Sequence, residues 1–449
     1  MSKLTEINKI SKDLYLIEDW QDCDSSVLEK ISIENFLESG VEVFSKQDSP
    51  HIVPHLITTS YPHAKSLALI LKEIFNNITS NRKLRVLETG AGSGIFSRNF
   101  LIAARELGFL DSIEYLVSDI SELGLKQIRD NKILDGFTEG EHYKFISLDL
   151  LNINDAKDLD GENFEVKDLD LVIFNYVLDQ IPMLPIRRVS DSEFKKLQIR
   201  ILTQHLEYSD LSNIKKLKNL RSLEIEKRWV NWELDSLDPL KKQHFDLLNK
   251  LFNKEPERRE AKFSPLTFEM FNTLKDRLTD LGAIYISDMQ SKISNSQKSS
   301  EYFGLFGGTK ANLIEEPLII LYFESLGYSH LHKREANLAR LFFFKNESMI
   351  NKQCRNAFFS NNDLEAYNQI ITMFPQIKDP SLIKVAKALL DRFLEIDNVS
   401  ATALTFQGSY HFLLKEYDKA LAFYKEALKI DFSSQWQLEF KINGTEAFI

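Results

Sequence analysis

Apolar residues in the stretch 84–107 change their spacing from that of a strand to that of a helix. A short apolar run, LRVL at 84–87, precedes three alternate glycines, Gly90, Gly92 and Gly94, after which apolar residues recur at helical spacing. Glycine tolerates positive φ angles and lets the main chain approach a ligand closely. The following helix offers free N–H groups at the turn. The stretch therefore predicts a strand, a tight turn and a helix, with a ligand at the turn.

The alternation of strand-like and helix-like stretches continues beyond this turn. Further strands are expected at 113–117 and 143–148, with a helix at 122–134 between them. The stretch 168–177 is apolar over a whole strand length, which is typical of a strand buried on both faces. This βαβαβ order predicts an α/β fold with a parallel sheet. Right-handed crossovers would then bring four strand ends to one edge, namely Gly90, Asp119, Asp149 and Asn175.

The patterning divides the chain into three parts. Residues 1–55 read as short helical pieces, to which no chemistry can be assigned. Residues 56–347 carry the sheet, with an insertion at about 183–262 that is charge-dense, expected to be helical and placed to cover a substrate pocket. Residues 348–449 follow helical spacing throughout.

The C-terminal part resembles tetratricopeptide repeats, whose period is about 34 residues. Within 401–434, small and large residues stand at the repeat positions Leu404, Gly408, Ala420, Tyr424 and Ala427. One period earlier, a degenerate copy carries Ala386, Leu390 and Phe393. Two units are fewer than such arrays need. We therefore expect this part to dock on the rest of the chain or to pair with a second copy, as in a homodimer.

Composition excludes several classes of function. The chain has 449 residues, of which 43% are hydrophobic and 27% charged, which suits a globular protein of two or three domains. A net charge of −10 lacks the basic field of nucleic-acid binders. Cys23 and Cys354 stand far apart, which speaks against a zinc site or a disulfide framework, and no other metal is expected. Without a signal-peptide pattern or an apolar run approaching ~20 residues, a cytoplasmic, membrane-free protein is expected.

The identity of the ligand follows from the residues around the glycines. A dinucleotide fingerprint needs a third glycine where Ile95 stands, and a phosphate loop needs a lysine that does not follow Gly94. The pattern has instead an acidic residue, Glu88, two places before Gly90, and a second one, Asp119, at the end of the next strand. It resembles the first motif of class I, Rossmann-like S-adenosylmethionine-dependent methyltransferases.

This resemblance implies S-adenosylmethionine as cofactor and assigns roles to the strand ends. The glycine turn would pass under the methionine part, Glu88 would orient it near the ammonium group, and Asp119 would bind the ribose hydroxyls. Ile120 would lie against the adenine ring, and the amino group of the adenine would face Asp149. The implied cofactor site comprises Glu88, Gly90, Ala91, Gly92, Gly94, Asp119, Ile120, Leu148, Asp149 and Asn175.

The end of the fourth strand is similar to the Asn-x-x-x-Asp-x-x-Pro signature of MidA-like methyltransferases, with Asn175, Asp179 and Pro182 at the signature positions. That branch includes protein arginine methyltransferases that act on respiratory-complex subunits. The likeness covers roughly 55–345 and continues into a fifth strand that ends at Asp288. The chain lacks the Asn/Asp-Pro-Pro-Tyr motif of many amine and amide N-methyltransferases, having Asn175 and Tyr176 without the prolines, which leaves the acceptor atom open.

Catalytic roles are expected for Asn175, Tyr176 and Asp179, because they follow the strand next to the glycine turn. Asp179 would anchor a cationic acceptor or take its proton. A guanidinium group is best held by a fork of carboxylates. The substrate-binding candidates are Glu224, Glu226, Glu233 and Asp288, with Trp229 and Trp232 as aromatic neighbours. In the alternative interpretation, the insertion is a lid with exposed acids and core tryptophans.

Three functions fit the sequence. The first is N-methylation of arginine or another amine-bearing acceptor, on a protein bound through the repeats. The second is methylation of a small molecule, such as free arginine or another amine metabolite, with the repeats used for dimerisation. The third is a non-catalytic repeat scaffold with a vestigial cofactor domain.

Overall fold

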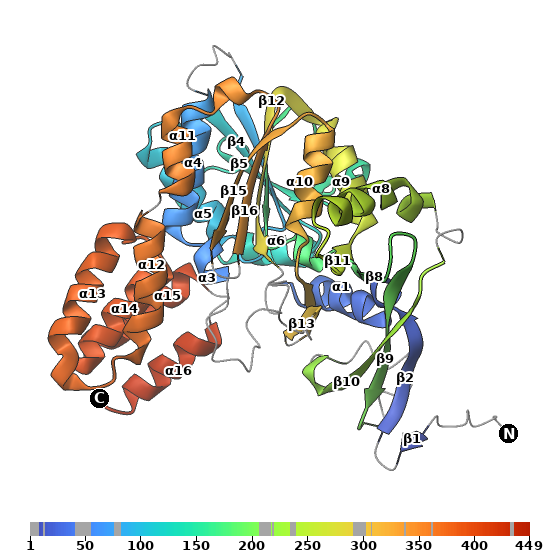
Figure 1. Ribbon diagram of the computed structural model, residues 1–449. Coiled ribbons are helices and arrows are strands. Elements are labelled where there is room, and N and C mark those ends of the chain that lie inside the picture. Colours follow the sequence, from blue (N-terminus) through green and yellow to red (C-terminus); the bar gives the residue numbers. More distant parts are fainter. Residues whose placement is uncertain are drawn as a thin grey trace.

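The computed structural model describes residues 9–11, 14–40, 55–75, 82–205, 217, 220–233, 239–290, 302–306, 308–335, 338–360, 362–431 and 435–449. A central sheet with helices on both faces forms the body of the molecule, a second sheet extends from one side of it, and a bundle of helices lies on the other side (Figure 1). No helix in these ranges is long and apolar enough to span a bilayer.

The central sheet has eight strands in the order β15-β16-β12-β7-β3-β4-β5-β6. Their bounds are β3 (Leu84–Thr89), β4 (Ile113–Asp119), β5 (Tyr143–Ser147), β6 (Lys157–Asp158), β7 (Leu169–Asn175), β12 (Leu278–Met289), β15 (Ser329–Glu335) and β16 (Leu338–Phe344). Neighbouring strands from β5 to β12 run parallel. The chain order reverses between β3 and β7, which is where open α/β sheets bind ligands. The predicted α/β fold is confirmed.

Side chains of the central strands alternate between two apolar cores. In β3, Val86 packs into the core under α4 (Tyr61–Phe75) and α5 (Ile95–Glu106), whereas Leu87 packs into the core under α9 (Pro265–Lys275) and α10 (Glu316–Ser325). All seven residues of β7 are buried, as predicted for a strand covered on both faces. α6 (Glu122–Asp130) packs beside β4 and β5 and ends before the expected residue 134.

The expectation of helices throughout residues 1–55 is wrong for their first described part. The strands β1 (Lys9–Ser11) and β2 (Leu14–Asp22) precede the short helix α1 (Val27–Ser39), and α3 (His55–Thr58) is a single turn. β2 pairs with β9 (Phe194–Thr203), for example through Leu16 and Leu202. The partner strand supplies the hydrogen bonds of β2, and local spacing contains no signal for a partner so distant in sequence.

The insertion at 183–262 was expected to be helical, and this is also wrong for most of it. It contributes β8 (Leu184–Arg188), β9, β10 (Leu223–Asn231) and β11 (Glu260–Phe263) to the second sheet, and α8 (Pro239–Lys254) is its one described α-helix. In β9, Leu197, Ile199 and Ile201 are buried while Gln198 and Arg200 between them are half-buried. This is the period of two of a strand. Part of the expected helix, 206–216, lies outside the described residues.

The C-terminal part is helical, as expected. It contains α11 (Lys352–Phe359), α12 (Asn362–Met373), α13 (Ile383–Ile396), α14 (Ala401–Leu413), α15 (Tyr417–Ile430) and α16 (Gln435–Glu446). A Cβ at Gly408 would lie 2.6 Å from the Tyr424 ring, so glycine permits close packing of α14 and α15. Arg98 of α5 donates a hydrogen bond to the Val399 carbonyl (3.0 Å), so the bundle touches the helix that follows the glycine turn. The assignment to tetratricopeptide repeats stays a prediction.

Candidate functional site

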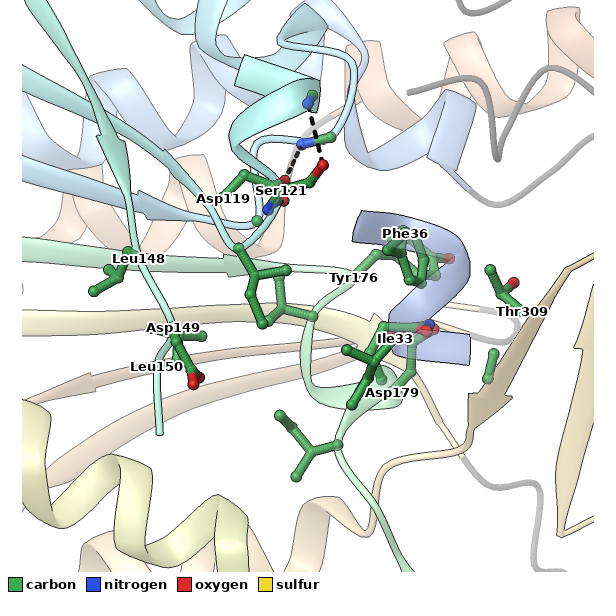
Figure 2. A pocket seen from close by; sticks show the side chains of 18 of the residues that line it. Ile33, Phe36, Asp119, Ser121, Leu148, Asp149, Leu150, Tyr176, Asp179 and Thr309 are labelled. Atoms are coloured by element: carbon green, nitrogen blue, oxygen red, sulfur yellow. Dashed lines mark hydrogen bonds between the residues drawn. The ribbon is translucent and has the colours of Figure 1, made fainter. Parts of the chain in front are cut away.

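A cavity of about 240 Å³ lies at the carboxyl edge of the parallel strands (Figure 2). The glycine turn after β3, the ends of β4 and β5 and the residues after β7 form one side of it. Residues of α1 and of β14 (Thr309–Asn312) form the other side. β14 pairs antiparallel with β13 (Phe303–Phe306) in a small two-stranded sheet. The topology therefore gathers strand ends and an N-terminal helix around one hollow.

The glycine turn has the backbone conformation that its residues predict. Gly90, Gly92 and Gly94 have φ angles of 66°, 54° and 75°, which side chains rarely adopt. A Cβ at Gly90 would lie 2.6 Å from Val177 Cγ2, so the turn can approach the residues after β7 only without a side chain. Gly90 and Gly92 line the cavity, whereas Gly94 caps α5 and packs against Ile128.

Asp119, at the end of β4, is half-buried and lines the cavity. Its Oδ2 accepts a hydrogen bond from the Gly92 N–H (3.0 Å) and its Oδ1 accepts one from the Ser121 N–H (2.9 Å). Burial raises the pKa of this carboxyl, and these backbone donors partly offset the rise. A carboxylate oxygen can accept more than one hydrogen bond, so the group has acceptor capacity left for a ligand.

The expected adenine neighbours also line the cavity. Ile120 is 40% exposed although it is apolar, and Leu148 is buried beside it in the lining. Asp149 accepts hydrogen bonds from the Leu151 N–H (2.9 Å) and the Asn152 side chain (2.7 Å), which hold its loop in place. An apolar slot with a carboxylate at its edge suits a flat heterocycle that carries an amino group.

Three other expected cofactor residues do not line this cavity. Glu88 lies below the turn, where the Ser97 and Tyr115 hydroxyls donate to it, and burial raises its pKa to about 7. Glu88 can therefore orient the turn, but the cavity does not place it beside a ligand ammonium. Ala91 donates its N–H to the Ser118 carbonyl (2.8 Å). Asn175 donates to the Thr58 carbonyl (3.3 Å), while its buried Oδ1 has no partner among the described residues.

The residues after β7 form the end of the cavity away from Asp119. Tyr176 has a φ angle of 57°, a strained value for a residue with a bulky side chain. Its buried hydroxyl and the Oε1 of Gln180 have no hydrogen-bond partner among the described residues, although both residues line the cavity. Strain and unsatisfied polar atoms of this kind cluster where a ligand completes the structure.

Two carboxyls that are far apart in sequence meet at this end. Asp179 is 2% exposed and lines the cavity, and its Oδ1 accepts a hydrogen bond from Gln180 Nε2 (2.9 Å). Asp288 is fully buried, and its Oδ2 accepts from the N–H groups of Leu178 (2.9 Å) and Asp179 (3.2 Å). Both Leu178 and Asp179 belong to a short 3₁₀ turn, η4 (Leu178–Gln180).

This carboxyl pair has perturbed electrostatics. Burial raises the pKa of Asp179 to about 7, and burial together with the neighbouring Asp179 raises the pKa of Asp288 well above its usual range. The same two carboxyls, after burial, raise the pKa of the Tyr176 hydroxyl. Within the described part of the chain, no lysine or arginine forms an ion pair with Asp179 or Asp288. The acidic pair Asp179 and Asp288 at this end of the cavity therefore has no cationic partner among the described residues.

The carboxylate fork expected in the insertion does not reach this cavity. Glu224, Glu226, Glu233, Trp229 and Trp232 are all absent from its lining. Glu226 pairs with Arg200 and Glu224 accepts from Gln204 (3.2 Å), while the Trp229 ring lies 4.1 Å from the Arg187 guanidinium. Trp232 is buried against Phe245 and Phe263. We expected a helix here, but pairing of β10 with β9 places Glu224, Glu226 and Trp229 in the second sheet, and Trp232 and Glu233 directly after it.

Sequence reasoning missed the contribution of α1. Ile33, Phe36 and the C-terminal Gly40 line the cavity, as do Thr309 and Ala311 of β14. The available signal was an apolar pair at helical spacing followed by glycine, in a segment without any recognisable motif. Such a signal predicts a helix end but does not say what the helix covers.

The described residues fit S-adenosylmethionine. The glycine turn presents its main chain to the cavity without Cβ atoms, Asp119 has acceptor capacity for two ribose hydroxyls, and Ile120 and Leu148 form an apolar slot. The family model of S-adenosyl-L-methionine-dependent methyltransferases matches residues 66–302, just over half of the chain. The chain belongs to this family. S-adenosylmethionine is thus the cofactor of this methyltransferase.

The chain is also similar to several solved structures. A COG1565 superfamily protein from Burkholderia thailandensis has 12% identity and a TM-score of 0.48, over 84% of this chain and 83% of its own. A COG1565 superfamily member from the same organism, bound to S-adenosyl-homocysteine, has 14% identity and a TM-score of 0.44, over 84% of each chain. Magnesium protoporphyrin IX methyltransferase from Synechocystis PCC 6803 has 12% identity and a TM-score of 0.33, over 71% and 97%. No curated protein matches the chain.

The cofactor supplies a methyl group that is already a strong electrophile, so the residues of the methyltransferase mainly hold and orient. Asp119 and the glycine turn, joined by the hydrogen bond from the Gly92 N–H, would hold the cofactor at their end of the cavity. Tyr176, Asp179 and Gln180 also line the cavity and would be available to hold a methyl acceptor. Most of the lining is apolar, which would limit the water around the reacting groups and so strengthen the orienting interactions.

Proposed function

We propose that this methyltransferase methylates a nitrogen of a cationic acceptor, either a guanidinium or an amine. The single observation that carries the proposal is the buried pair of Asp179 and Asp288 at the end of the cavity, which has no cationic partner among the described residues. A buried carboxylate is costly unless a cation or several donors compensate it. A cationic acceptor would provide that compensation.

The carboxyls of Asp288 and Asp179 would have different roles. Asp288 is held by backbone N–H groups on both oxygens, including that of Met289 (2.7 Å), so it fixes the η4 turn that carries Asp179. Asp179 has capacity left for the acceptor and faces the cavity. A carboxyl whose pKa lies at about 7 can also take the proton that a nitrogen releases on methylation.

The resemblance to MidA-like methyltransferases supports an arginine on a protein as the acceptor. The C-terminal helices would then bind the substrate protein or a partner, in the manner of tetratricopeptide repeats. The alternative is a small acceptor, such as free arginine or another amine metabolite, with the helices joining two copies.

A transfer assay with methyl-labelled cofactor tests the proposal. The protein is incubated with lysate, the products are divided into protein and small-molecule fractions, and the labelled residue is identified after hydrolysis. We expect label on a guanidinium or amine nitrogen, with turnover lost in Asp179→Asn while the Kd for S-adenosylmethionine changes little. Asp149→Asn is the matched control at the cofactor end and should alter cofactor binding instead. Label on oxygen or carbon would refute the cationic acceptor.

A further inference from the structure

The N-terminal helix α1 is attached to the cavity by one face and bounds it with another. Its buried face carries Glu29, Ser32 and Asn35. Glu29 forms a buried ion pair with Lys310 of β14, and the Ser32 hydroxyl accepts a hydrogen bond from the Lys310 N–H (3.1 Å). Asn35 donates to the Gly308 carbonyl (2.7 Å). These contacts determine the position of α1 relative to the β13–β14 hairpin.

The hairpin in turn connects α1 with the acceptor end. β14 packs against both α1 and the η4 turn that carries Asp179, and Asn312 of β14 donates to the Ile181 carbonyl (3.0 Å). Ile33 and Phe36 project from α1 into the same cavity as Tyr176 and Asp179 (Figure 2). Ile33 is 37% exposed and lines the cavity, so a ligand there would cover apolar surface that is now in contact with solvent.

The end of α1 leaves little freedom for the helix to shift. Gly40 closes α1 with a φ angle of 54°, and a Cβ there would lie 3.0 Å from the backbone nitrogen of Gly124 in α6. α6 begins directly behind Asp119, in the loop that lines the cofactor end. The helix is therefore fixed at the acceptor end through Glu29 and at the cofactor end through Gly40.

We infer that Ile33 and Phe36 of α1 form a specificity-determining wall, which selects acceptors that carry their reactive nitrogen on an apolar stem. The inference rests on the proposed function in one respect, since it takes this end of the cavity as the acceptor site. The apolar residues Val177, Ile181, Met289 and Ala311 also line the cavity. The acidic groups would select the nitrogen head, and the wall would select what the head is attached to.

The test measures binding of two series of small probes to the complex with S-adenosyl-homocysteine. The first series runs from methylguanidine to n-butylguanidine, and the second consists of the corresponding alkylureas, which are neutral. Burial of one methylene group strengthens binding by about 4-fold. We expect the wild-type Kd of the guanidines to fall about 3- to 4-fold per methylene. Phe36→Ala and Ile33→Ala should each remove most of this dependence on length.

Leu37→Ala is the matched control, because Leu37 is an exposed apolar residue of the same helix that does not line the cavity. It should keep the full dependence on length. The Kd of S-adenosyl-homocysteine, measured for each variant, reports whether the fold and the cofactor end are intact. Phe36→Trp, which narrows the cavity, should weaken binding of the longest probes selectively.

The outcomes separate the inference from the proposed function. If only the alkylureas bind, with a length dependence that Phe36→Ala removes, then the wall is supported and the cationic acceptor is refuted. If affinity does not depend on length, or the dependence survives both α1 substitutions, then the wall is refuted whatever the head group. Failure of both series to bind the complex would likewise overturn the inference.

Discussion

Replacing Asp179 tests most directly whether the Asp179–Asp288 pair lacks a cationic partner, because its ionisation should make the free energy of unfolding depend on pH. Its pKa of about 7 in the folded protein compares with an ordinary value of 3.8, which describes the unfolded chain. Between these two values the folded state binds the proton more strongly, so the stability that the protonated carboxyl contributes is lost as pH rises from about 4 to about 7. Asn keeps the shape and removes the ionisation.

The magnitude follows from the same two values. At about 1.4 kcal/mol per pH unit, the difference between 3.8 and about 7 corresponds to at most about 4 kcal/mol. Asp288 lies beside Asp179 and shares the titration, so we expect a gain of about 2 kcal/mol or more for Asp179→Asn at pH 8 relative to pH 4. The same variant should have lost its turnover, so stability and activity change in opposite directions.

Thermal unfolding of the wild type and of Asp179→Asn, at several values between pH 4 and pH 8, measures this effect. The variant should gain in melting temperature relative to the wild type as pH rises. Asp130→Asn, at the exposed end of α6, is the control and should not change the pH dependence. If Asp179→Asn follows the wild-type curve, or is less stable at pH 8, then a cation already compensates the site and the reasoning for a cationic acceptor fails.

Three further predictions concern the cofactor, the acceptor and α1. Asp119→Ala should weaken S-adenosylmethionine binding by ~1–3 kcal/mol in calorimetry, because hydrogen-bond acceptors for the ribose are lost; an unchanged Kd would exclude that role. The KM for a cationic acceptor should rise as pH falls below about 7, where Asp179 is protonated, and a flat KM profile would contradict this. Glu29→Gln should destabilise the fold by about 3–5 kcal/mol by leaving Lys310 unpaired, as denaturant unfolding would show, whereas Glu29→Leu with Lys310→Met should restore most of it.

The cofactor end of the site was predictable because its requirements are local. Gly90, Gly92 and Gly94 have positive φ angles, and only glycine adopts these freely, so the turn can be recognised from three residues. The position of Asp119 beside the turn could be predicted because this residue ends the strand that lies parallel to β3. Asp179 was recognisable for a similar reason, since it lies four residues beyond the end of an apolar strand.

The acceptor end depended on pairings that no local pattern contains. Asp288 meets the N–H of Asp179 across 109 positions of sequence because β12 lies next to β7 in the sheet. The pairing of β2 with β9 and of β9 with β10 decided that the first residues and the insertion form a sheet, which placed the expected acids of the insertion away from the cavity.

The sequence by itself determined the α/β fold, the glycine turn, the cofactor and the position of Asp179 after the fourth parallel strand. Each of these depends on backbone conformations and hydrogen bonds among residues close together in the chain. Only the tertiary structure decided that Asp288 accepts a hydrogen bond from the Asp179 N–H and that residues of α1 line the cavity. These contacts depend on the register of strands and on helix docking, in which the favourable burial is shared by segments that are far apart in sequence.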